Sequence, residues 1–107
     1  MEKPMQLVRI YLSEADQGKK HNMLDEIFEI LHDKHMVHGV TVFRGIAGFG
    51  AKGTVHSADL LRLAQRLPLV IEFFDEESIV TTALQALEGL IPSGHVISWI
   101  VSCHVSG

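Results

Sequence analysis

The chain has little of several features that would place it in other protein classes. Its 107 residues include a single cysteine, so no internal disulfide can form. It has no signal-type apolar run, and no apolar stretch approaches the ~20 residues that a membrane-spanning helix needs. The sequence therefore predicts a cytoplasmic protein of one domain, residues 1–107, with enough apolar residues for a single core.

The lone cysteine, Cys103, lies in the almost wholly apolar run ISWIVSCHV. A free cysteine in such a run usually behaves as a small buried hydrophobic residue. We therefore expect a buried, inert thiol.

Positive charge is also scarce, because nine Lys and Arg face thirteen Asp and Glu, for a net charge of −4. Nucleic-acid binding usually needs a broad basic face, so it is not expected here. The segment from Arg44 to Arg66 is an exception, with four cationic side chains against one carboxylate and a local charge of +3. A local positive region on an acidic protein suits a small anionic ligand.

The spacing of apolar residues predicts six elements in the order strand, helix, strand, strand, helix, strand. The four strands are Gln6–Leu12, Val40–Ile46, Leu69–Phe74 and Val96–Val105. The helices carry the apolar stripes Leu24–Leu31 and Ile79–Leu87, with Asn22 and Asp75 as expected N-terminal caps and Gly39 and Gly89–Gly94 as expected ends. This order predicts an α+β ferredoxin-like βαββαβ sandwich, a four-stranded antiparallel sheet with two helices on one face.

The other face of that sheet also needs cover. The last strand, VISWIVSCHV, is apolar at nearly every position, and large apolar side chains facing water would forgo several kcal/mol, at about 25 cal/mol per Å². We expect this face to pack against other copies of the chain, which predicts a homo-oligomer.

Function is expected in the run from Gly39 to Gly53, which holds five of the nine glycines. Glycine lets successive backbone N–H groups approach a ligand and form a concavity that favours an anion such as phosphate. The link 49–67 between the second and third strands is too long for an ordinary hairpin loop. Its second half, SADLLRLAQRL, has helical spacing, so we expect a short helix and a lid or sensor.

Several stretches together resemble a known family. They are the opening strand RIYLSE, the block GVTVFRGIAGFG, the following His56-Ser57, the strand LPLVIEFFD and the closing hydrophobic strand. The chain thus resembles, over about Gln6 to Val105, the uncharacterised PII-like proteins of domain of unknown function 190.

The resemblance implies a PII-like trimer that binds an adenine nucleotide (AMP, ADP or ATP) in clefts between subunits, with the long loop reporting occupancy to a regulated transporter or enzyme. The uridylylated tyrosine of broader PII proteins is absent, since 49–67 contains no Tyr. The glycines and Phe49 would supply backbone donors, while Arg44, Lys52 and His56 would meet phosphates. The full set of expected ligand-binding residues is Arg44, Gly45, Gly48, Phe49, Gly50, Lys52, His56, Ser57, Pro92, Ser93 and Gly94, the last three forming the opposite wall by analogy with PII-like proteins.

Two of these side chains have a structural alternative. Arg44 could form an ion pair with Glu72 across the hairpin, and His56 could make a hydrogen bond that stabilises the loop. Both alternatives stay open at the level of the sequence.

A dinucleotide-dependent enzyme is the main rival function. Gly48, Gly50 and Gly53 fit the G-x-G-x-x-G pattern, and Glu72 follows at close to the spacing of the ribose-binding acid. That fold needs further βαβ units, which the predicted elements do not supply. A Walker P-loop fails because Ala51 stands where its lysine is required.

A metal-binding oligomer similar to the copper-tolerance relatives of the PII fold is the second rival. His32, His35 and His38 lie three residues apart, with His21 upstream, but no Cys or well-placed carboxylate completes a ligand set. A solvated helix face is the favoured interpretation. No Ser-His-Asp order or paired-carboxylate pocket indicates catalysis, so a regulatory protein rather than an enzyme is expected.

Overall fold

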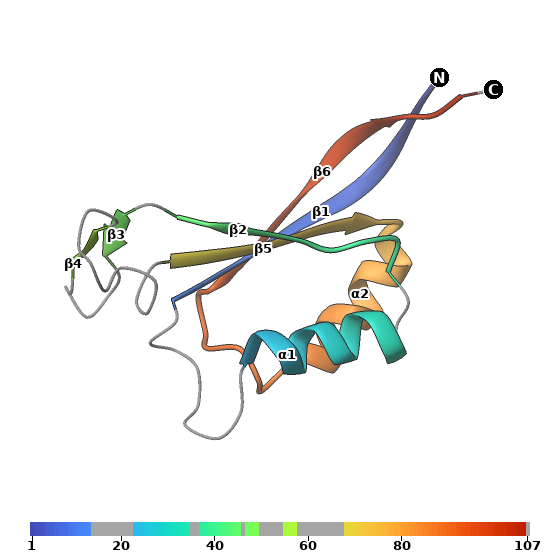
Figure 1. The fold of residues 1–107 in the computed structure, drawn as a ribbon. Coiled ribbons are helices and arrows are strands. Elements are labelled where there is room, and N and C mark those ends of the chain that lie inside the picture. Colours follow the sequence, from blue (N-terminus) through green and yellow to red (C-terminus); the bar gives the residue numbers. More distant parts are fainter. Residues whose placement is uncertain (14–22, 35–36, 46, 50–54, 58–67, 107) are drawn as a thin grey trace.

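The computed structural model of the chain describes residues 1–13, 23–34, 37–45, 47–49, 55–57 and 68–106. The helices lie on one side of a sheet, and a small hairpin extends from one end of it (Figure 1). In chain order the elements are β1 (Glu2–Ser13), α1 (Met23–Phe28), the π-helix η2 (Glu29–Lys34), β2 (Thr41–Arg44), β3 (Ala47–Phe49), β4 (Val55–Ser57), β5 (Pro68–Asp75), α2 (Glu77–Leu87) and β6 (Val96–His104).

Strands β1 and β5 form the middle of a four-stranded antiparallel sheet with the order β2-β5-β1-β6. The register places Ile10 of β1 opposite both Ile71 of β5 and Val96 of β6. Because α1 and α2 cover the same side of this sheet (Figure 1), the α+β ferredoxin-like fold predicted from the sequence is confirmed.

The core lies between the helices and one face of the two central strands. Alternate side chains of β1 and β5 point into it, as strand geometry requires, and the helices supply the other half. Its buried members are Val8, Ile10, Leu12, Ile27, Leu31, Leu69, Ile71, Phe73, Val80, Ala83 and Leu87. The predicted stripe of the first helix is narrower than expected, since Phe28 is exposed where the helix widens into η2.

Asp75 has a different role from the one predicted. The residue at the N-cap of α2 is Glu76, which makes no side-chain capping bond, and Asp75 is the last residue of β5. The Asp75 carboxylate is fully buried and accepts hydrogen bonds from Glu76 N at 2.8 Å, His38 N at 2.9 Å and His38 Nδ1 at 2.8 Å. It therefore ties the connection before β2 to the start of α2.

The segment between β2 and β5 also differs from the expected long loop. Strands β3 and β4 pair as a small antiparallel hairpin, with Ala47 opposite Ser57 and Phe49 opposite Val55. Strand β2 is accordingly shorter than the predicted Val40–Ile46, because the chain leaves the main sheet after Arg44. The predicted short helix falls within 58–67, outside the described residues.

Strand β6 lies at an edge of the sheet and pairs only with β1. None of its side chains is fully buried, although most of them are apolar. Cys103 is therefore half-buried rather than buried as expected, and its Sγ lies 3.9 Å from the carbonyl oxygen of His104.

Candidate functional site

The small hairpin brings part of the predicted ligand-binding set together. Gly48 lies directly opposite His56 in the β3–β4 pair, one residue from Phe49 on one strand and from Ser57 on the other. The pairing thus places the backbone of Gly48 and Phe49 beside that of His56 and Ser57. Gly50 and Lys52 lie outside the described residues, so their predicted roles stay predictions.

Gly45 marks the place where the chain leaves the sheet for this hairpin. Its backbone N–H donates to the carbonyl oxygen of Pro68 at 2.7 Å, and a Cβ at this position would lie 2.6 Å from Pro68 Cγ. The two chain ends of the segment 46–67 therefore meet at this contact. Glycine is required here for close packing, a role that the sequence pattern of the glycine block did not reveal.

Arg44 is the last residue of β2. The strand register does not favour the ion pair with Glu72 that was its structural alternative. Arg44 lies opposite Leu69, whereas Thr41 lies opposite Glu72. Glu72 instead accepts a hydrogen bond from Arg9 Nε at 2.7 Å. Arg44 is exposed at the end of the sheet from which the hairpin extends.

The turn at Pro92, Ser93 and Gly94 forms the second predicted wall. Gly94 has a φ of +84°, which favours glycine, and His95 N donates to Pro92 O at 3.3 Å. His95 anchors the turn to β1, since Tyr11 N donates to His95 O at 2.8 Å and His95 Nδ1 lies 2.7 Å from Tyr11 O. A carbonyl oxygen only accepts, so the hydrogen of this second bond belongs to Nδ1.

One chain does not bring these two walls together. Arg44 leaves the sheet from β2, the turn enters it at β6, and both β5 and β1 lie between them. Three strand spacings amount to about 14 Å, which is too far for one phosphate group to contact both walls. Within one chain, the two predicted walls therefore lie apart.

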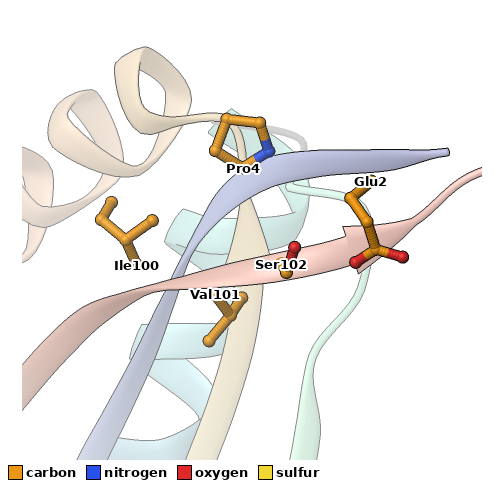
Figure 2. Close-up of a pocket in the computed structure, with 5 residues that line it drawn as sticks. All are labelled: Glu2, Pro4, Ile100, Val101 and Ser102. Atoms are coloured by element: carbon orange, nitrogen blue, oxygen red, sulfur yellow. The ribbon is translucent and has the colours of Figure 1, made fainter.

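A cavity of about 240 Å³ lies elsewhere, on the ribbon formed by the ends of β1 and β6 (Figure 2). It is lined by Glu2, Pro4, Ile100, Val101 and Ser102. No basic side chain lines it, and the carboxylate of Glu2 would repel a phosphate, although His104 Nδ1 lies 3.3 Å from Glu2 Oε2. It is not a nucleotide site.

The histidines predicted as possible metal ligands do not converge in the described residues. His32 Nδ1 contacts Asp33 Oδ1 at 2.5 Å, while His38 bonds to Asp75. His21 and His35 lie outside the described residues, and no group of three metal-ligating side chains occurs within the described ones.

The dinucleotide alternative also lacks its structural context. Its fingerprint needs parallel βαβ units, whereas every strand pair described here is antiparallel. Glu72, its candidate ribose-binding acid, lies in mid-strand and bonds to Arg9.

Within the described ranges, no helix is long and apolar enough to cross a membrane.

Comparison with known proteins gives a family match. The sequence model of the protein family DUF190, described as "Uncharacterized ACR", matches residues 5–103. The UPF0166 protein MJ1524 of Methanocaldococcus jannaschii is 35% identical over 99 residues, which cover 92% of this chain and 89% of that protein.

Solved structures of similar fold are more distant in sequence. CPII, a nitrogen regulatory PII-like protein from Thiomonas intermedia K12 bound to ADP, AMP and bicarbonate, superposes with a TM-score of 0.66 at 19% identity, covering 96% of this chain and 91% of its own. The divalent ion tolerance protein CutA1 from Ehrlichia chaffeensis gives a TM-score of 0.57 at 11% identity, covering 100% and 87%. These likenesses show a shared fold.

Proposed function

The chain belongs to the DUF190 family, and we propose that it is a PII-like regulatory protein that binds an adenine nucleotide, AMP, ADP or ATP, between the subunits of a homotrimer. The observation that carries the proposal is the fold that it shares with CPII, whose structure holds ADP and AMP. The proposed location is the cytoplasm, and the proposed action is regulation of a transporter or an enzyme rather than catalysis.

The separation of the two walls supports a cleft between subunits. Arg44 and the β3–β4 hairpin of one copy would form one wall, and the turn before β6 of a second copy would form the other. Phosphates would lie against the backbone of Gly48, Phe49 and Gly50, with Lys52 and His56 close by. A site of this kind exists only in the assembled protein, which couples nucleotide binding to subunit association.

The two walls offer different chemistry to a nucleotide. The hairpin wall combines glycine backbone donors with cationic side chains, which suits a phosphate chain. The turn wall adds backbone groups that His95 holds in place against β1. Segment 49–67, which includes the hairpin strand β4, would act as the sensor that reports occupancy to the regulated partner.

Isothermal titration calorimetry with AMP, ADP, ATP, NAD and divalent metal ions tests the proposal and its two rivals together. We expect an adenine nucleotide to bind and the Arg44→Ala variant to bind it about 10-fold to 150-fold more weakly, since a charge-assisted hydrogen bond to phosphate is worth about 1.5 to 3 kcal/mol. Lys3→Ala is the matched control, because it removes a positive charge from the far end of β1.

Light scattering on the same samples should give about three chains per particle for the wild type and for both variants. Binding of NAD or of a metal ion in place of the three adenine nucleotides would overturn the proposal in favour of one of the rivals. Unchanged affinity in Arg44→Ala would move the site away from β2, and dissociation of that variant into single chains would assign Arg44 a structural role instead.

A further inference from the structure

The turn wall ends at His95, the one side chain of that turn that can carry a positive charge. Arg66 is the last Lys or Arg of the chain, so His95 and His104 are the only side chains in 67–107 that can become cationic. His104 lies at the far end of β6, beside Glu2. The hairpin wall differs, because the charge of Arg44 does not depend on pH. The charge of the turn wall is therefore set by the protonation of His95.

The hydrogen bonds of His95 give its two ring nitrogens different roles. Tyr11 N donates to His95 O at 2.8 Å, and in an antiparallel pair His95 N would return a bond to Tyr11 O. His95 N donates instead to Pro92 O at 3.3 Å, within the turn. The imidazole Nδ1 takes its place, 2.7 Å from Tyr11 O. Because a carbonyl oxygen only accepts, Nδ1 carries a hydrogen in the neutral ring and in the charged ring alike.

Nε2 is therefore the nitrogen of His95 that gains or loses a proton. It accepts hydrogen bonds in the neutral ring and donates one in the charged ring. The ring is half-buried, and Nε2 has no hydrogen-bond partner in the part of the chain that the structure describes. Imidazole is the side chain that ordinarily changes its charge between about pH 5 and pH 8. Protonation leaves the bond to Tyr11 in place, so the wall can change its charge while it keeps its anchor.

The charged groups around His95 leave an imidazolium uncompensated within the described residues. On β1, to which His95 bonds, Tyr11 is its direct partner, and Arg9 is the next charged side chain back along the strand. Arg9 is itself paired with Glu72. On its own stretch of chain, 89–107 contains no carboxylate, and Glu88 follows α2 before the turn begins. A proton on Nε2 thus adds positive charge to the turn wall.

We propose that protonated Nε2 of His95 donates a hydrogen bond to a phosphate oxygen of the bound nucleotide, so that the protein binds nucleotide more tightly as the pH falls. The inference rests on the proposed function, because it concerns the same site, and it adds a binding residue and a form of regulation. A phosphate oxygen only accepts, so neutral Nε2 offers it nothing. The imidazolium supplies a charge-assisted bond, and nucleotide binding then takes up a proton.

Calorimetric titration of the wild type and His95→Asn with AMP, ADP and ATP tests the inference. The Asn amide can donate to Tyr11 O in place of Nδ1, so the variant loses only the titrating nitrogen. We expect equal affinities at about pH 8 and about tenfold tighter binding by the wild type at about pH 6. The comparison of two proteins at one pH cancels the titration of the nucleotide itself. Repeating the titrations in buffers of different ionisation enthalpy should show proton uptake by the wild type that His95→Asn lacks.

His104→Asn is the matched control, because it removes the other histidine of β6 at the end of the strand far from the turn. It should follow the wild type at both pH values. Circular dichroism checks that the variants retain the fold. If His95→Asn does not, His95→Lys replaces it: its charge is permanent, so it should bind about tenfold more tightly than the wild type at about pH 8 and equally at about pH 6.

Two outcomes separate this inference from the proposed function. If the affinities of the wild type and His95→Asn differ by the same factor at both pH values, His95 only anchors the turn, and the nucleotide site stands without it. If no adenine nucleotide binds to the wild type at either pH, the proposed function is wrong, and the inference falls with it.

Discussion

Strands β5 and β6 have almost the same apolar content and opposite environments. In β5, every second side chain is buried, from Leu69 at 3% exposure to Ile71 at 0%. In β6, Ile97 is 45% exposed and Ile100 is 58% exposed. The difference comes from position, because β5 has strands on both edges and helices on one face, whereas β6 has one neighbouring strand. The buried apolar residues of β5 therefore stabilise the fold of the single chain, whereas the apolar residues of β6, like Phe74 on the other side of β5, remain in contact with water.

The largest expected effect comes from truncating the same residue type in each strand. Ile71→Ala removes a fully buried side chain and should lower the free energy of unfolding by about 2 to 5 kcal/mol, through lost burial and the cavity left behind. Ile97→Ala should change it by less than about 1 kcal/mol in dissociated chains, because the side chain is already in contact with water. Urea unfolding, carried out at a protein concentration low enough for the assembly to be dissociated into single chains, measures both changes in the free energy of unfolding.

If Ile71→Ala and Ile97→Ala lowered the free energy of unfolding equally, β5 and β6 would not differ in their contribution to the fold. In the assembled protein, Ile97→Ala should weaken association instead. That second measurement tells whether the exposure of β6 is compensated by a partner chain.

The next effect concerns the end of β5. Asp75→Asn removes the buried charge that accepts two hydrogen bonds from His38 and one from Glu76, and should lower the free energy of unfolding by about 1.5 to 3 kcal/mol. Glu76→Gln, which affects only an exposed ion pair with Lys3, is the adjacent control and should cost no more than about 1 kcal/mol. Chemical denaturation of the two variants makes the measurement.

The effect of Asp75→Asn on the free energy of unfolding should depend on pH. Burial raises the pKa of Asp75, but the hydrogen bonds from Glu76 and His38 outweigh it and hold the pKa below its ordinary value of 3.8. The ionised carboxylate therefore stabilises the fold at all pH above that value, and this contribution is lost as the pH falls through the lower folded-state pKa. The difference between wild type and Asp75→Asn should be constant from neutral pH down to the ordinary value and narrow below it. A difference that grows with acidity would contradict the hydrogen-bonding account.

The smallest effect is expected at the other end of β5, where Gly45 packs on Pro68. Gly45→Ala should cost about 1 to 3 kcal/mol of unfolding free energy, since its Cβ would lie 2.6 Å from a rigid ring atom. Gly39→Ala is the matched control, because a Cβ at that position meets nothing within 4 Å. The control should be neutral or slightly stabilising through the unfolded chain. If both variants unfold alike, the contact with Pro68 does not constrain the strand.

Local patterns predicted the order of elements and most of the core. Alternation assigned the two faces of β1, and helical spacing found Ile27 and Leu31, because burial on one side leaves a periodic pattern. The same patterns could not tell that β6 lies at an edge, since strand order depends on contacts between residues far apart in sequence. The apolar run around Cys103 therefore predicted more burial than one chain provides.

The candidate site was harder to predict for the same reason. The glycine block and the nearby His56 were recognisable, and the structure pairs their backbones in one hairpin. The packing role of Gly45 depends on Pro68, and the anchoring of the turn depends on Tyr11, which is 84 residues from His95. Asp75 was interpreted from its neighbours as a helix cap, while its main partner, His38, lies 37 residues away. Long-range contacts of this kind leave no local signal.

The bond between Gly45 N and Pro68 O has a further consequence for how such proteins diversify. It closes the segment 46–67 at its base, so both ends of that segment leave the sheet at one point. The entropy of closing a loop rises only slowly with its length, so the same base can carry segments of different size and composition at little cost to the fold. The segment can then vary while the sheet and the helices stay the same.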